Sequence, residues 1–83
     1  MVDLSDLVHM SGNEAILYAY LKAIARKRGK KQAFFELDTG SITRALSMSR
    51  RQIVHSRDRL VDLGKIAYIH GKNQNNKPRW KLL

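Results

Sequence analysis

One segment, SRRQIVHSRDRLVDLGKI, carries local signals for both ends of a helix. Ser49 and Gln52 have capping-box spacing, and Met48 and Ile53 stand at the positions of a hydrophobic staple. Two independent devices therefore predict that the helix starts at Ser49, and Gly64 is a natural stop. The apolar residues between these ends form one stripe that we expect to face the core: Ile53, Leu60 and Leu63.

A second, shorter helix is expected directly before this one. Asp38 is its predicted N-cap, with Leu37 and Ile42 at the staple positions around it. The helix should reach about Ser47, so that only residues 47–49 connect it to the next helix. Such a short connection favours a helix-turn-helix. The side chains expected to face the core are Ile42, Ala45 and Leu46.

The first helix is expected over residues 12–28. Ser11 and Glu14 have capping-box spacing, and Gly29 is a natural residue just beyond the helix end. Cations near that end are favoured by the helix dipole. The predicted apolar stripe comprises Ile16, Leu17, Tyr20, Leu21 and Ile24.

Three short strands complete the pattern. Residues 32–37 read as one strand, and residues 65–70 and 79–82 as a hairpin around the polar loop Gly71–Pro78. The first strand should place Phe34 and Phe35 on opposite faces. The predicted fold is α+β, with three helices and a small three-stranded antiparallel sheet in the order α-β-α-α-β-β.

The length of 83 residues allows one domain, expected over 13–83 after an N-terminal arm of residues 1–12. The absence of cysteine excludes a disulfide framework or thiolate zinc site and fits a reducing, cytoplasmic setting. There is no apolar run of about 20 residues and no signal peptide, so no membrane association is expected.

The net charge of +9 is concentrated in the second half of the chain. Residues 1–38 carry six Lys and Arg against five Asp and Glu, whereas residues 39–83 carry ten against two. A solvated, highly soluble surface would explain some of this excess. Concentrated positive charge also attracts phosphates, and together with the helical pattern it favours nucleic-acid binding.

The stretch SRRQIVHSRDRLVDLGKIAYI resembles the recognition-helix-to-wing segment of winged-helix regulators. It is especially similar to the N-terminal domains of phage and plasmid replication initiators, including DnaD-like ones. The resemblance covers roughly residues 13–83, and its Ser…Leu-Gly-x-Ile frame is specific for the fold but not for one function. It implies a recognition helix, Ser49–Leu63, in the major groove of duplex DNA, and a wing, Gly71–Pro78, on the backbone or minor groove. Arg57 departs from the pattern, since many relatives are apolar there, and either a structural or an exposed role remains open for it.

Candidate base and phosphate contacts lie on the third helix. Arg51 is the first choice for a bidentate contact to guanine, because its planar fork matches O6 and N7. Arg50 is expected to read a base or clamp a phosphate, and His55 to donate to either. Arg59 is expected to contact a phosphate or pair with Asp62. For each, a solvated surface side chain is the alternative.

Further candidates flank this helix. Ser41, Thr43 and Arg44 could hold the DNA backbone, and the wing offers Lys72, Asn73, Asn75, Lys77 and Arg79, with Gln74 and Asn76 beside them. The run of cations over 26–31 is interpreted as a solvated helix end, with a second backbone contact or a partner site as alternatives. The aromatic residues are expected in the core rather than in base stacking.

The function that this pattern favours is binding of duplex DNA in replication initiation or transcription regulation, with a homodimer or a replication or transcription protein as a possible partner. The alternative is a winged-helix protein-interaction module without DNA readout. No catalytic motif is present, so no enzyme activity and no cofactor are expected. Three histidines, His9, His55 and His70, fall in three different segments, which argues against a metal site.

Overall fold

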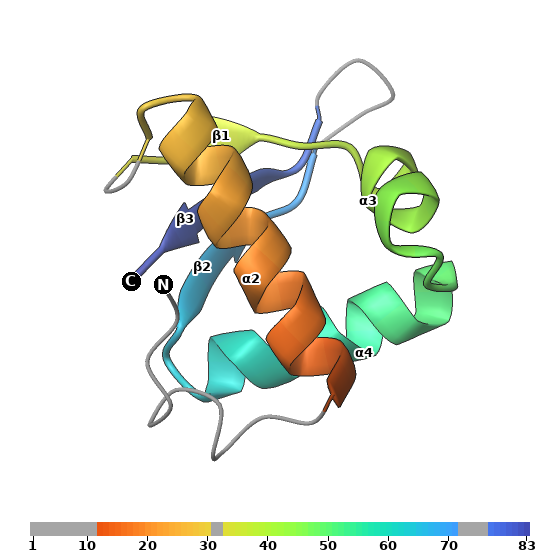
Figure 1. The fold of residues 1–83 in the computed structure, drawn as a ribbon. Helices are drawn as coiled ribbons and strands as arrows, with labels where there is room; N and C mark the ends of the chain where they lie inside the picture. The colour runs from red at the N-terminus through yellow and green to blue at the C-terminus, as the bar shows by residue number, and fades with distance from the viewer. Residues whose placement is uncertain (1–11, 31–32, 72–76) are drawn as a thin grey trace.

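A computed structural model describes residues 12–30, 33–71 and 77–83 of the chain. Within these residues the protein is a small α+β domain of three helices and a three-stranded antiparallel sheet, in the predicted order (Figure 1). α2 runs across one face of the sheet, and α4 crosses the N-terminal half of α2. The elements are α2 (Gly12–Lys27), β1 (Phe35–Glu36), α3 (Thr39–Leu46), α4 (Arg50–Asp62), β2 (Ile66–Ile69) and β3 (Arg79–Leu82).

The predicted ends of α4 are confirmed. Ser49 Oγ accepts a hydrogen bond from the Gln52 N–H at 3.1 Å, and Gln52 Oε1 accepts one from the Ser49 N–H at 2.9 Å. Met48 and Ile53, the staple residues, are both buried. At the other end Gly64 has a φ of 72°, which lets the following amide reach back to the Leu60 carbonyl at 2.9 Å. Local sequence therefore fixes where this helix begins and ends.

The start of α3 also follows the prediction. Asp38 is the N-cap, and its carboxylate accepts a hydrogen bond from the Gly40 N–H. Leu37 and Ile42 are buried as a staple requires. Ala45 is exposed, so its predicted place in the core is wrong; Ile42 is the fully buried residue of this helix, and Leu46 packs against the core. The helix ends at Ser47, which has a left-handed φ of 54°.

The sheet is organised around β3, which pairs with β1 on one side and β2 on the other. Trp80 of β3 lies opposite Phe35 and Tyr68. Its Nε1 donates a hydrogen bond to the Leu37 carbonyl at 3.0 Å, so that this buried indole has a polar partner. β1 is shorter than predicted, because the Ala33 N–H bonds back to the Lys30 carbonyl at 3.4 Å before the strand, and the chain turns into α3 at Asp38 after it. The strands at 66–69 and 79–82 agree with the predicted hairpin.

The core lies between the sheet and the helices. It contains buried side chains from every element: Leu17, Tyr18, Leu21, Ala25, Phe35, Leu37, Ile42, Met48, Ile53, Leu60, Ile66 and Trp80. Leu63, predicted in the α4 stripe, is half-buried, whereas Ser56 is fully buried. Phe34, expected in the core, is 39% exposed. The other aromatic residues are buried or packed against the core.

The predicted stripe of α2 is correct only in part. Leu17 and Leu21 are fully buried, and Tyr20 and Ile24 pack at the edge of the core, but Ile16 is 49% exposed. The buried side instead carries Glu14, Tyr18 and Ala25 with the two leucines. α2 packs against both α4 and β3. The side of α2 that faces them therefore includes smaller and more polar residues than the predicted apolar stripe. The predicted cap Ser11 and the proposed arm lie outside the described residues.

Candidate nucleic-acid interface

The exposed side of α4 is basic at its beginning and acidic towards its end. Arg51 and His55, one turn apart, are both exposed on the side opposite the buried Ile53 and Leu60. Neither interacts with another side chain of the described residues by a hydrogen bond or ion pair. Asp58 and Asp62 continue this exposed side after His55. An approaching polyanion is therefore favoured at the first half of the helix, whereas in the second half Arg57, 2.9 Å from Asp58, offsets the charge of that acid.

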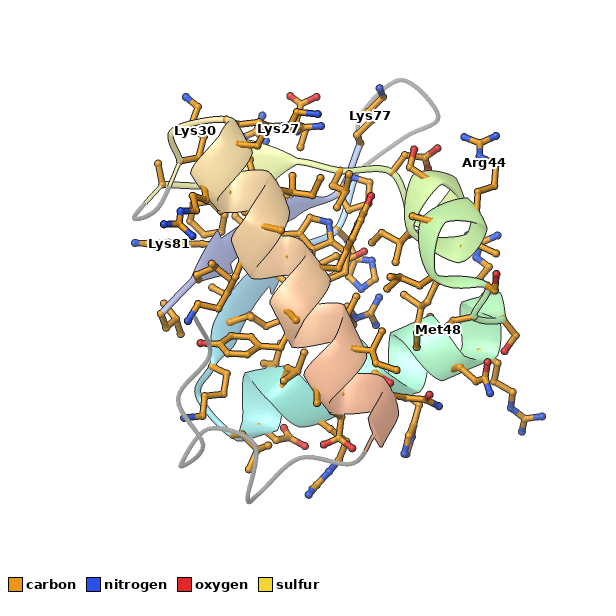
Figure 2. All side chains as sticks on the ribbon, in the orientation of Figure 1. Lys27, Lys30, Arg44, Met48, Lys77 and Lys81 are labelled. Carbon is orange, nitrogen blue, oxygen red and sulfur yellow. The ribbon has the colours of Figure 1, made fainter. Side chains whose placement is uncertain are left out.

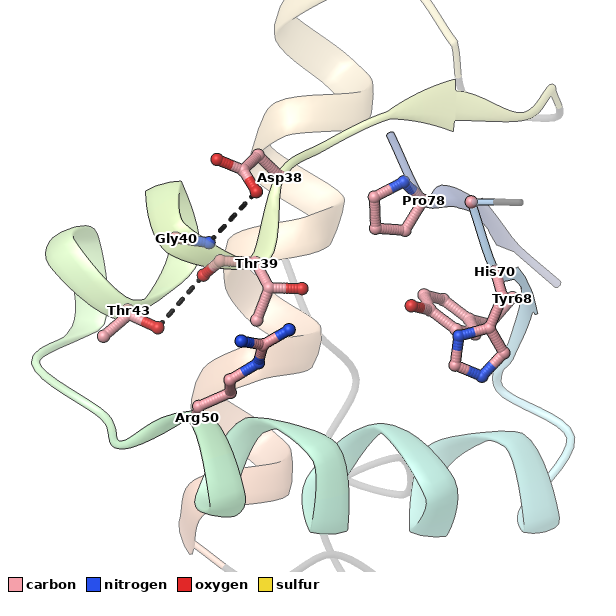
Figure 3. Close-up of a pocket in the computed structure, with 9 residues that line it drawn as sticks. Asp38, Thr39, Gly40, Thr43, Arg50, Tyr68, His70 and Pro78 are labelled. Atoms are coloured by element: carbon pink, nitrogen blue, oxygen red, sulfur yellow. Dashed lines mark hydrogen bonds between the residues drawn. The ribbon is translucent and has the colours of Figure 1, made fainter. Parts of the chain in front are cut away.

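A polar pocket of about 410 Å³ lies beside the start of α4 (Figure 3). The guanidinium of Arg50 extends towards Thr39 at the beginning of α3, and Tyr68, His70 and Pro78 lie across the pocket. Three separate parts of the chain therefore form its walls. The complete lining is Asp38, Thr39, Gly40, Thr43, Arg50, Tyr68, His70, Gly71 and Pro78.

The pocket offers hydrogen-bond donors from both sides. Arg50 and His70 supply nitrogen donors, while the Thr43 hydroxyl is occupied by a bond to the Thr39 carbonyl at 3.0 Å. The carboxylate of Asp38 offsets part of the positive charge and is held at the α3 N-terminus by Gly40. A lining this polar suits a sugar–phosphate segment better than an apolar ligand.

Arg59 has a partner on another helix that was not predicted from the sequence. Its Nε lies 3.7 Å from Oε1 of the buried Glu14 on α2. The predicted pairing with Asp62 is therefore wrong, because the side chain turns towards α2 instead of along its own helix. A phosphate contact by the exposed part of Arg59 stays a prediction.

Arg57 also serves the fold. Its Nε and an Nη contact Asp58 Oδ1 at 3.1 and 2.9 Å, and its guanidinium carbon lies 4.3 Å from the centre of the Tyr68 ring. Only 12% of the side chain is exposed. These contacts support a structural role for Arg57, the position at which many winged-helix proteins have an apolar residue.

The remaining sequence candidates lie in two groups. Ser41 is half-buried on α3, and Arg44 is exposed near its end, away from the sheet (Figure 2). Lys77 and Arg79 are exposed at the base of the hairpin. The predicted wing contacts Lys72, Asn73 and Asn75 lie outside the described residues.

Thr39, Tyr68 and His70 were missed as candidates. Thr39 follows a recognisable N-cap, so its position at a helix start was available in the sequence. Tyr68 and His70 had no such signal, because their approach to α3 and Arg50 depends on how the hairpin packs.

No protein family, curated protein or solved structure matches this chain. In the described part of the chain, no three histidine, aspartate or glutamate side chains are grouped as a metal site would need. Across the same residues, no helix has the length and apolar character of a bilayer-spanning segment.

Proposed function

We propose that this chain is a winged helix-turn-helix domain that binds duplex DNA. α4 enters the major groove with its first turns, and the hairpin of β2 and β3 lies along the neighbouring backbone or minor groove. The order of the elements and the central place of β3 in the sheet are compatible with this fold. The resemblance of Ser49–Ile69 to a recognition helix and the start of a wing adds sequence support.

The observation that carries the proposal is the exposure of Arg51 and His55 on the basic half of α4. Ile53 and Leu60 anchor the opposite side in the core, so the helix can present both side chains without losing its packing. Arg51 reads guanine through its two parallel donors, a contact worth about 1–3 kcal/mol of discrimination. Asp62 weakens the attraction of the second half of the helix for phosphates, and the charge of Asp58 is offset by Arg57.

Arg50 has a different task in this proposal. Because its guanidinium lies in the pocket between α3 and the hairpin, it holds the sugar–phosphate backbone that passes between the two DNA-contacting elements. His70 contacts the same strand from the opposite wall. Arg50 therefore positions the protein, while Arg51 specifies sequence. The domain serves replication initiation or transcription regulation, since both use this kind of module.

The test begins with selection of a preferred site from random duplexes. Arg51→Ala should lower affinity for that site by about 1–3 kcal/mol and change affinity for a scrambled duplex much less. Arg26→Ala is the matched control, because Arg26 is an exposed arginine on α2. A palindromic site would additionally indicate a homodimer. Equal losses on both duplexes would make Arg51 a phosphate contact, and no duplex binding by the wild-type protein would refute the proposal.

A further inference from the structure

The outer face of the sheet, on the side away from the core, combines cations with exposed apolar groups. On the central strand, Arg79 and Lys81 alternate with the buried Trp80, so both point to this face. Ile69 lies opposite Arg79, and Ala67 lies opposite Lys81. Phe34 belongs to the same face, because Lys81 Nζ lies 5.7 Å from the centre of its ring. None of these residues lines the pocket beside α4.

Further positive charge lies beside the edge strand β1, at the end of α2. An Nη of Arg28 donates a hydrogen bond to the Glu36 carbonyl of β1, which holds this guanidinium beside the sheet. Lys27 and Lys30 are exposed at the same end of α2 (Figure 2). Glu36, opposite Arg79, is the acidic residue of this face within the described chain. Cations therefore outnumber acids here, and the ligand that complements them is a polyanion.

The apolar groups distinguish between kinds of polyanion. Phe34 is 39% exposed and Ile69 is 46% exposed, because strand alternation places both large hydrophobic side chains on the face away from the core. A duplex hides the faces of its bases in the helical stack, whereas a single strand offers them for contact with aromatic and apolar side chains. An exposed aromatic ring beside a cation is thus of use to a single strand and of little use to a duplex.

We propose that this outer face binds single-stranded nucleic acid, at a site separate from α4. Phe34 stacks with a base, Ile69 makes apolar contact with a neighbouring one, and Arg79 and Lys81 bind the phosphates. The distance of 5.7 Å between Lys81 and the ring is near the outer limit for a cation–π contact, so the ammonium leaves the ring for a phosphate at little cost. The proposal does not depend on the duplex function of α4.

Fluorescence anisotropy with a labelled oligothymidylate of about ten nucleotides tests the site, since this length matches single-strand sites in proteins. Phe34→Leu keeps an apolar side chain but removes the ring, and it should weaken binding about 5- to 150-fold, as expected for one lost base stack. Phe34→Trp should retain or increase affinity. Arg79→Ala with Lys81→Ala should weaken binding and reduce its salt dependence. Ile16→Leu is the control and should bind as the wild type does, because Ile16 is an exposed apolar residue of α2 that belongs to neither proposed site.

Three results would overturn the proposal. The first is wild-type affinity in both Phe34→Leu and the Arg79→Ala, Lys81→Ala variant. The second is an equal loss in Arg51→Ala, which would assign the single strand to α4. The third is displacement of the oligothymidylate by polyglutamate of equal charge as readily as by unlabelled oligothymidylate, because the face would then recognise acidic chains and not bases. Thermal unfolding of each variant, followed by circular dichroism, separates loss of binding from loss of fold.

Discussion

Replacement of Ser47 by glycine should stabilise the protein. Ser47 ends α3 with φ 54° and ψ 33°, a left-handed conformation that costs a residue with a Cβ roughly 1–2 kcal/mol. Its side chain is exposed, so little packing is lost with the hydroxymethyl group. Glycine adopts this conformation without that cost, but its greater freedom in the unfolded chain takes back about 0.4–1 kcal/mol. The net gain should be about 0.5–1 kcal/mol.

Circular dichroism during thermal unfolding measures this effect. For a domain of this size the gain corresponds to a rise in Tm of about 2–8 °C. Gly64→Ala is the opposite control: Gly64 has φ 72°, and an added Cβ would meet no described atom within 4 Å. Its expected loss of about 1 kcal/mol is therefore conformational and not steric. If Ser47→Gly lowers Tm, the left-handed turn between α3 and α4 is wrong.

Three further substitutions test the helix and the pocket. Ser49→Ala should lower the free energy of unfolding, measured in urea, by about 1 kcal/mol, because it removes the oxygen that accepts the Gln52 N–H. An unchanged urea midpoint would contradict the capping box. Leu60→Ala should cost about 2–5 kcal/mol in the same assay, since Leu60 is fully buried, and a smaller loss would show that the core closes around the gap. Arg50→Ala should weaken preferred and scrambled duplexes alike in a binding titration, and loss confined to the preferred duplex would make Arg50 a base reader.

The ends of α3 and α4 could be predicted because their signals are local. The Ser49–Gln52 pair, the Asp38 cap and Gly64 act within a few residues of themselves, and the structure contains the bonds that those residue types imply. The hairpin strands were predictable for a similar reason, since alternation along a strand is also local.

The buried side of α2 and the walls of the pocket were not predictable in this way. Glu14 is buried where α2 packs against α4, with Arg59 of that helix 3.7 Å away, and no spacing within α2 predicts this packing. Arg50 and His70 line the same pocket only because the hairpin packs beside α3. The exposed positions of Arg51 and His55 could be predicted from the sequence, because their place opposite Ile53 follows from helical periodicity alone.

The dependence of duplex affinity on salt tests the DNA-binding account most directly. The second half of the chain carries a net charge of +8, so binding should neutralise on the order of five phosphates. A plot of log K against log salt concentration should then fall with a slope of roughly −4 to −5, from about −0.9 per phosphate. A flat plot, with affinity independent of salt, would contradict the claim that this basic surface binds duplex DNA.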